Sequence, residues 1–286
     1  MRKNRIAPLI TAGLLLLGLC GCSDSVVDTD NSKSTVDFSI GLVTDVQGIE
    51  DEAFNEGIWK GMDRFKADTG CSVSYKESAD EKDYTANLKS LASEDCNLIV
   101  APGYVFQEPM NAASDEFNMK QFLIIDSVLA GKENVASAVF AEEEGSFLVG
   151  VAAAQTAIND KRDIVGFIGG GDYDLTWEFE AGFEAGVRAV SEDLIILSDY
   201  VGDFSDKSQS IAANMYEEGA YVIYHAAGED SIGLMTEAKE RRSNGEEVWV
   251  IGTNYDQFNE GIYDGDKSVV LTSMVKRCDV ALYTVA

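Results

Sequence analysis

An aspartate, an aromatic ring and an amide follow one predicted strand closely, at Asp45, Phe54 and Asn55. An aromatic ring offers a flat face for stacking, and a carboxylate and an amide offer hydrogen-bonding edges. In an open parallel sheet, ligands bind beyond the carboxyl ends of the strands. The group therefore predicts a site for a flat, polar small molecule. We expect Asp51 only to cap the following helix, and the alternative for Asp45 is that it closes a turn.

Other polar and aromatic side chains also follow predicted strands, and these ends would converge on a cleft between two halves of the chain. They are Tyr104, Phe106, Asp126, Phe204, His225 and Gly228, with Asn254, Asp256 and Lys276 on segments predicted to cross between the halves. Because His225 ends an apolar strand, we expect it to be buried and hydrogen-bonded instead of acting as a general base. Asp45 and Asp126 could alternatively form the acid–base pair of a glycoside- or nucleoside-cleaving enzyme.

Short β-branched runs alternate with amphipathic helical segments from residue 37 onward. This alternation is typical of βαβ units and a mainly parallel sheet. It starts afresh near Asp163, so two similar α/β halves are expected. The glycine run 169–171 lacks both the Gly-Lys-Ser/Thr ending of a P-loop and a GxGxxG pattern, and we interpret it as a tight strand-to-helix turn.

A long helix is predicted over residues 142–158, between the two halves. We expect its buried face to contain Phe147, Leu148, Val151 and Ala154. Near the end of the chain, a strand is predicted over 268–274. A helix that begins at Arg277 is cut short by the chain end, and we suspect that more sequence once followed.

The chain is strongly acidic, with 22 Lys+Arg against 50 Asp+Glu and a formal net charge of -28. Such a surface repels a phosphate backbone, so nucleic acid is not expected as a partner, and an uncharged ligand suits it better than an anionic one. A hydrophobic fraction of 45% over 286 residues is enough to fill two cores. With one histidine and no metal-ligand spacing among the cysteines, we expect no metal site and no cofactor.

The N-terminus has the layout of a bacterial lipoprotein signal peptide over residues 1–22. Basic residues precede an apolar run from Ile6 to Leu19, which is shorter than the roughly 20 residues needed to span a bilayer. Small residues lead into Cys22, matching a lipobox in which this cysteine becomes the lipid-bearing N-terminus. Residues 23–36 are polar and are predicted to form a flexible tether.

Three further cysteines, Cys71, Cys96 and Cys278, belong to the part of the chain expected to fold. An exported protein can form disulfides, so a bond between Cys71 and Cys96 is one possibility. Three separate thiols are the alternative, and the odd number leaves the choice open.

Several motifs together resemble the basic membrane protein (Bmp), or purine nucleoside receptor, family of lipoproteins, which are solute-binding subunits of ABC transporters. The resemblance covers nearly the whole chain after the leader. It rests on DVQGIEDEAFN at 45–55, NVAS at 134–137, EEEG at 142–145, FEAG at 179–182, HAAG at 225–228 and LTSMVK at 271–276. It implies a type I periplasmic-binding-protein fold, in which two Rossmann-like lobes with parallel sheets are joined by a three-crossover hinge. We assign residues 37–139 and 254–274 to the first lobe, and 140–253 and 275–286 to the second.

The resemblance also implies a purine nucleoside as ligand and a role for each matching residue. Phe54 and Phe204 would stack on the two faces of the base, while Asp45, Asn55 and Asp126 would bond its edges. Gly228, Asn254 and Lys276 would hold the ribose. The family's Val-Asp-Ser-Asp-Gln reads Thr253-Asn-Tyr-Asp-Gln257 here, so an uncharged amide at Asn254 replaces the first aspartate, and Asp256 completes the set of ligand-binding residues.

The sequence therefore predicts a lipid-anchored, extracytoplasmic solute-binding protein of a bacterial ABC transporter. We expect it to be a monomer that closes its lobes on a nucleoside, presents the closed form to the permease and ATPase subunits, and catalyses no reaction. Two alternatives remain, which are the hydrolase with Asp45 and Asp126 and a ligand-sensing receptor without a transport role.

Overall fold

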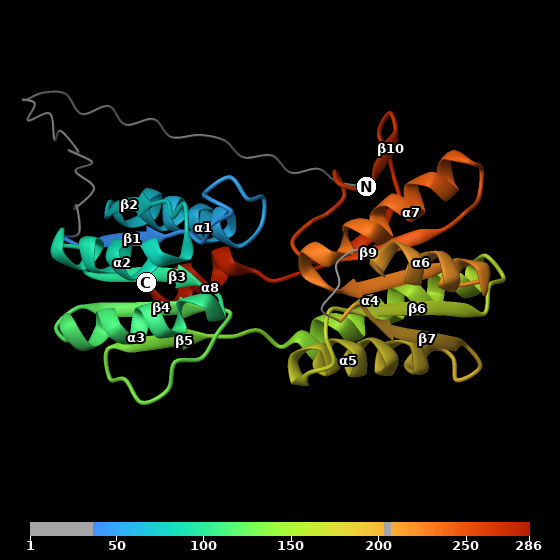
Figure 1. Ribbon diagram of the computed structural model, residues 1–286, viewed down its shortest axis with the longest axis horizontal. Coiled ribbons are helices and arrows are strands. Elements are labelled where there is room, and N and C mark those ends of the chain that lie inside the picture. The colour runs from blue at the N-terminus through green and yellow to red at the C-terminus, as the bar shows by residue number, and fades with distance from the viewer. Residues whose placement is uncertain (1–36, 203–206) are drawn as a thin grey trace, which may run out of the picture. The chain divides into compact units, whose positions relative to one another are not determined.

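The computed structural model describes residues 37–202 and 207–286, which contain two five-stranded parallel sheets (Figure 1). The first sheet has the order β2-β1-β3-β4-β5 and the second β12-β9-β8-β6-β7. The first comprises β1 (Ser39–Val43), β2 (Ser72–Lys76), β3 (Leu98–Pro102), β4 (Gln121–Ile125) and β5 (Val135–Ala138). The second comprises β6 (Ile164–Gly169), β7 (Ile195–Tyr200), β8 (Val222–Ala226), β9 (Trp249–Asn254) and β12 (Val270–Val275). This confirms the predicted parallel α/β architecture.

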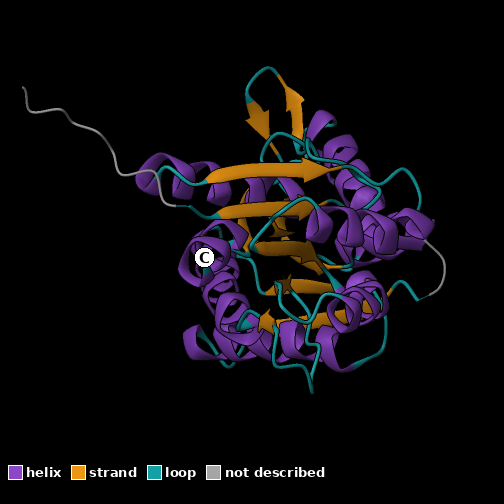
Figure 2. Ribbon diagram, turned by 90° about the vertical axis from the view of Figure 1, so that its left-hand side faces the viewer, coloured by secondary structure: helices purple, strands orange, loops and turns teal. Residues whose placement is uncertain are grey.

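Helices cover both faces of the strands, as Figure 2 shows in purple. Around the first sheet lie α1 (Phe54–Thr69), α2 (Tyr84–Ser93), α3 (Gln107–Glu116) and α8 (Cys278–Val285), with short 3-10 turns at Glu81–Asp83 and Tyr104–Phe106. β3 is buried along its whole length because one core, around Ile58 and Met62, packs on one face and another, around Leu88 and Phe106, packs on the other. Burial on both faces explains the continuous apolar runs in these strands. We call this sheet and its helices the first lobe.

The second lobe is built in the same way from the second sheet. α4 (Glu142–Asn159) and α5 (Asp174–Val190) share one core with it, around Phe167 and Phe183. α6 (Lys207–Glu217) and α7 (Ile232–Ser243) share the core on the other face, a 3-10 turn spans Gly228–Ser231, and a hairpin of β10 (Ile262–Asp264) and β11 (Lys267–Ser268) follows β9. The hairpin was not predicted, and it breaks the strand expected over 268–274.

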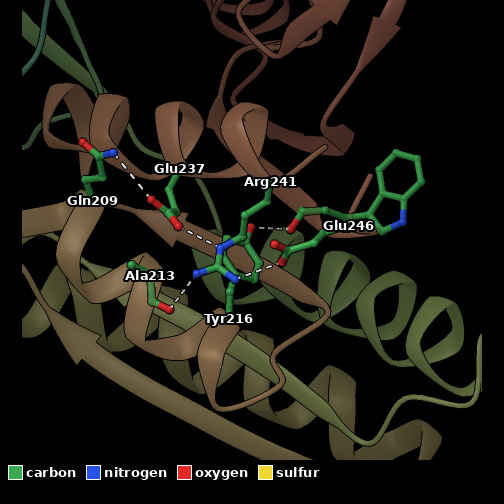
Figure 3. A network of polar contacts seen from close by, with 7 residues as sticks. Gln209, Ala213, Tyr216, Glu237, Arg241 and Glu246 are labelled. Atoms are coloured by element: carbon green, nitrogen blue, oxygen red, sulfur yellow. Dashed lines mark hydrogen bonds and ion pairs between the residues drawn. The ribbon is translucent and has the colours of Figure 1, made fainter. Parts of the chain in front are cut away.

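Arg241 fastens α7 to α6 (Figure 3). Its guanidinium donates to Glu237 at 2.7 Å and Glu246 at 3.0 Å, and it reaches the carbonyl of Ala213 at 3.3 Å. The planar guanidinium holds its donors in a fixed fork, which matches acceptors that lie in different directions better than the compact ammonium of a lysine would. Arg241 therefore adds polar contacts between two helices that already share an apolar core.

The two C-terminal segments lie in the opposite lobes from those we predicted. β12 pairs in parallel with β9, and its Val270 and Met274 are buried in the second lobe, so residues 254–274 do not belong to the first. Conversely, α8 lies beside α1 in the first lobe, although 275–286 were assigned to the second (Figure 1). Gly61 permits this approach, because a Cβ there would lie 2.6 Å from the carbonyl oxygen of Asp279.

Within the described residues, the chain passes between the lobes twice, at residues 139–141 and 276–277. We call these the first and second connections. Three crossovers were expected, and two are present among the described residues. The helices among these residues lack the length and apolar character of a membrane-spanning segment.

The buried face of α4 differs from the predicted one. Phe147 and Leu148 were expected in the core, but they are 37% and 68% exposed. Ala154 is buried as predicted, and the small residues Gly150, Ala153 and Ala157 are buried in place of the two larger ones. The reason is the close approach of α5, since a Cβ at Gly150 would collide with the carbonyl of Phe183.

Candidate functional site

The loop between β1 and α1 is organised around Asn55, which is fully buried. Its amide nitrogen donates to Asp45 at 2.8 Å and to Asp51 at 2.9 Å, and its oxygen accepts from the backbone N–H of Asp45 at 3.2 Å. Both amide hydrogens are therefore engaged within the loop. A ligand that used Asn55 would have to compete with these two carboxylates.

Asp51 caps α1, as the sequence predicted. Its carboxylate accepts from the backbone N–H groups of Ala53, Asn55 and Glu56, each at 2.9 Å. These are donors that the first turn of a helix leaves without an intrahelical partner. The cap fixes the start of α1 and thereby the position of Phe54, the first residue of the helix.

A buried lysine joins residues from both lobes. The ammonium of Lys276 lies 2.7 Å from Asp126 Oδ1 and 2.7 Å from Glu142 Oε1. The side chain of Lys276 is 3% exposed, that of Glu142 6% and that of Asp126 19%. The ammonium also lies 5.9, 5.7 and 5.3 Å from the ring centroids of Phe54, Phe140 and Phe179, respectively. These distances permit cation–π attraction.

Each member of this cluster stands where an element ends or begins. Asp126 follows β4 with a left-handed φ of 64°, and its N–H donates to the carbonyl of Ala138 at 2.7 Å. Glu142 is the first residue of α4, directly after the first connection. Lys276 follows β12, where its N–H donates to the carbonyl of Asn254 at 2.8 Å. The ends of β4 and β12 and the start of α4 therefore bring the three charges together.

The charges in the cluster act on the carboxyl group of Asp126. Burial raises its pKa, the ammonium of Lys276 lowers it, and the carboxylate of Glu142 raises it again. The result is a pKa above the ordinary value of an aspartate. Two carboxylates thus share one cation in a site of low polarity.

A cavity of about 680 Å³ adjoins the cluster. It is lined by Asp126, Val139, Phe140, Ala141, Glu142, Glu143, Leu175 and Glu178. Its volume lies within the roughly 300–1,000 Å³ of small-molecule sites. The acidic lining favours an uncharged or cationic ligand over an anion.

Three of the carboxylates, on Glu142, Glu143 and Glu178, come within 4.8 Å of one another and could hold a cation by distance alone. Glu142 already pairs with Lys276, however, and exposed acidic groups often lie close together without a metal. Distance alone is therefore weak support for a cation site here. The expectation of no metal stays a prediction.

The predicted ribose-side residues surround the ends of β8 and β9. Gly228 is exposed with a left-handed φ of 54°, and Asn254 has a φ of 72°. The side-chain oxygen of Asn254 is buried with no hydrogen-bond partner among the described residues. Asp256 is exposed, and its carboxylate accepts from the N–H of Phe258 at 3.1 Å. Phe204 and Cys22 lie outside the described residues.

His225 has the buried, hydrogen-bonded position that the sequence predicted, with 1% exposure. Its Nε2 lies 2.8 Å from Gln257 Oε1, which also accepts from the N–H of Thr253 at 2.9 Å. The amide oxygen can only accept, so Nε2 carries the hydrogen. Burial lowers the pKa of His225 to about 4, against the raising effect of its bond to Gln257, and the ring is neutral near pH 7.

Three other expectations can be compared with the structure. The glycine run ends β6 at Gly169, and α5 begins at Asp174, which confirms the tight turn. The three cysteines are all free and buried, in agreement with the alternative of separate thiols. Asp45 and Asp126 have different partners, Asn55 and Lys276, so nothing in this geometry favours an acid–base pair.

Glu142 is the one charged member of the cluster for which the sequence predicted no role in the site, although it begins the EEEG motif. An acidic residue in the first turn of a helix is ordinarily explained by the helix dipole, and three occur here in succession. The signal that could have found it is the apolar character of the rest of α4, which makes one of these glutamates face the interior.

Comparison with known proteins agrees with this fold. The family model of Bmp, described as ABC transporter substrate-binding protein PnrA-like, matches residues 38–286. The "CD4+ T-cell-stimulating antigen" of Listeria innocua is 38% identical over 99% of this chain and 83% of its own length. The "ABC transporter nucleoside-binding protein BmpA" of Lactococcus lactis is 34% identical over 100% of this chain and 84% of its own length.

Among solved structures, an ABC transporter solute-binding protein from Aeropyrum pernix is 26% identical, with a TM-score of 0.68. The match covers 86% of this chain and 69% of that one. The two parallel sheets with their flanking helices are those of type I periplasmic solute-binding proteins. The chain therefore belongs to the Bmp family of ABC transporter substrate-binding proteins.

Proposed function

We propose that this substrate-binding protein binds a purine nucleoside or a close analogue for uptake. The observation that carries the proposal is the convergence of Phe54, Asp126 and Lys276 beside a cavity of about 680 Å³. An aromatic face, a carboxylate and an ammonium are the groups that a base with N–H edges and a sugar with hydroxyls would use. A relative that matches the whole chain is named as nucleoside-binding.

In this proposal, Phe54 stacks on the base, and Asp126 accepts hydrogen bonds from its N–H edge. Asp45 and Asn55 complete the base side, with Phe204 on the opposite face. Stacking contributes roughly 1–3 kcal/mol per base, and the paired polar groups discriminate against ligands that lack the matching donors.

The sugar would be held by Gly228, Asn254, Asp256 and Lys276. Asn254 has a buried, unpartnered oxygen among the described residues, and such an atom gains from accepting a ribose hydroxyl. Lys276 would donate to the sugar while it keeps a carboxylate partner.

We also propose that the protein is a monomer held on the extracytoplasmic face of the cell membrane through a lipid on Cys22. Residues 1–22 would be its signal peptide and 23–36 its tether. Closure of the two lobes on the ligand would then present the loaded form to the permease and ATPase subunits, because only a ligand with higher affinity for the closed state can shift that equilibrium.

Isothermal titration of the full chain in mild detergent with adenosine, guanosine, inosine, uridine, free adenine and ribose tests the ligand. We expect at least one purine nucleoside to bind with a Kd of roughly micromolar or tighter, and Phe54→Ala to weaken it by about 5- to 150-fold, since the lost stacking amounts to about 1–3 kcal/mol. Phe258→Ala, at an exposed aromatic residue of the second lobe, is the matched control. Absence of binding to every nucleoside would refute the proposal.

A further inference from the structure

Glu142 belongs to none of the motif positions assigned to the ligand, yet it makes as close a contact with Lys276 as Asp126 does, 2.7 Å in both cases. We propose that Glu142 is a positioning residue of the ligand site: it holds the Lys276 ammonium in place so that the Asp126 carboxylate can turn to the ligand. The inference rests on the proposed function, and it adds a residue and a mechanism to it.

The need for a second carboxylate follows from the burial of Lys276. A cation with 3% of its side chain exposed requires a partner, because a buried charge without one is strongly destabilising. Asp126 alone would have to divide one negative charge between the lysine and the ligand. Its Oδ1 accepts from Lys276, and the same side chain lines the cavity. With Glu142 present, Lys276 keeps a full counter-charge when the ligand engages Asp126.

Glu142 is suited to be the fixed partner. It is the first residue of α4, where the helix dipole stabilises its negative charge, and its side chain is more deeply buried than that of Asp126. The rings of Phe54, Phe140 and Phe179 stand around the ammonium and restrict its movement. Lys276 therefore has one partner fixed on the second lobe and one more exposed partner on the first.

The test compares Glu142→Gln with Glu144→Gln in the full chain, by titration with the purine nucleoside that the wild type binds best. Glu144 is an exposed residue of the same helical turn, so its variant matches the change in charge and helix dipole. We expect Glu142→Gln to raise the Kd about tenfold to a hundredfold, the range for a lost charged hydrogen bond, and Glu144→Gln to change it less than twofold. Thermal melting of each variant verifies that it is folded.

A second readout distinguishes positioning from a merely structural role. Asp126 faces Lys276 and Glu142, with Glu143 and Glu178 also on the cavity and the thiol of Cys278 in its field. Ligand binding through an ionised Asp126 weakens as pH falls through its pKa, and Glu142 raises that pKa. Glu142→Gln should therefore shift this loss of affinity, which is the acid limb of the pH profile, to lower pH. Glu142→Asp, which keeps the charge but shortens the side chain, should raise the Kd and leave the limb in place.

The outcomes separate the two proposals. If the wild type and Glu144→Gln bind no nucleoside, the proposed function fails and the inference fails with it. If they bind, and Glu142→Gln and Glu142→Asp bind as tightly with an unchanged acid limb, the inference alone is overturned. Should Glu142→Gln melt below the assay temperature, Glu142→Asp decides the question by its Kd.

Discussion

His225 is the only histidine in the chain, and its environment links the protonation of one residue to the stability of the fold. Among the described residues its Nδ1 has no hydrogen-bond partner, and burial lowers its pKa from 6.5 to about 4. In the unfolded chain the ring takes up a proton near pH 6.5, whereas the folded protein resists this. The stabilisation from the neutral ring is therefore complete above pH 6.5 and is lost as pH falls from 6.5 toward 4.

This linkage predicts the effect of His225→Gln. Glutamine keeps an N–H at the end of the side chain but does not titrate, so the variant should lack the histidine's share of the pH dependence. We expect the free energy of unfolding to fall by about 2 kcal/mol more in the wild type than in the variant between pH 7 and pH 5. Urea denaturation at both pH values measures it. The carboxylates titrate in both proteins, so an equal decline in the two would contradict the assignment.

The gathering of Phe54, Asp126 and Lys276 could be predicted from sequence because each lies at the end of an element: Phe54 begins α1, Asp126 follows β4 and Lys276 follows β12. What could not be predicted is how these polar groups satisfy one another. The amide of Asn55 donates to Asp45 and Asp51, and Lys276 forms an ion pair with Glu142, which is far away in sequence. Such pairings depend on distances of a few ångströms, and periodicity carries no information at that scale.

The packing of α4 against α5 decides where Phe179 and Glu142 lie. Three glycines make the contact possible, since a Cβ at Gly150, Gly182 or Gly186 would collide with a backbone carbonyl of the opposite helix. In α5, Gly182 meets the backbone of Glu143, one residue after Glu142. The motif FEAG therefore has a packing role next to the lysine cluster.

Gly182→Ala tests this role. Alanine favours a helix by up to about 1 kcal/mol over glycine, but the collision is with backbone and cannot be relieved by a flexible side chain. Overpacking of this kind costs about 1–3 kcal/mol, so we expect net destabilisation together with weaker ligand binding. Gly57→Ala in α1 is the matched control, because its Cβ would lie 3.4 Å from the Cβ of Cys278, an ordinary contact. Chemical denaturation of both variants gives the comparison, and equal stability of the two would contradict the argument.

The elements themselves were largely predictable, because β-branched runs and helical periodicity are strong local signals. The face that α4 buries was not. A pattern of apolar residues ranks Phe147 and Leu148 above alanine and glycine, yet close helix packing selects the small residues. The hairpin of β10 and β11 was missed for a related reason, since short exposed strands leave little periodic signal.

At the scale of the molecule, the sequence predicted two similar lobes but exchanged their last segments. Strand β12 and helix α8 are apolar enough to pack in either lobe. The order of strands in each sheet also differs from their order along the chain, so it cannot be inferred from the sequence order. The prediction that Lys276 lies on a segment between the lobes was nevertheless correct, since it lies in the second connection. A residue that joins two lobes is identified by its place between elements, whichever lobe each element joins.

The charge of the whole molecule predicts which ligands the site rejects. The net charge of -28 and the four carboxylates that line the cavity oppose an anion, while one buried ammonium, already paired with two of them, offers little compensation. Adenosine 5′-monophosphate should therefore bind at least about tenfold more weakly than adenosine at 50 mM NaCl. Raising NaCl to 500 mM shortens the screening length to roughly a third. The affinity for the nucleotide should then rise while the affinity for the uncharged nucleoside stays unchanged, so the difference between the two affinities should narrow. Competition titrations at both salt concentrations decide this: equal affinities at low salt would mean that the field of the protein does not select the ligand.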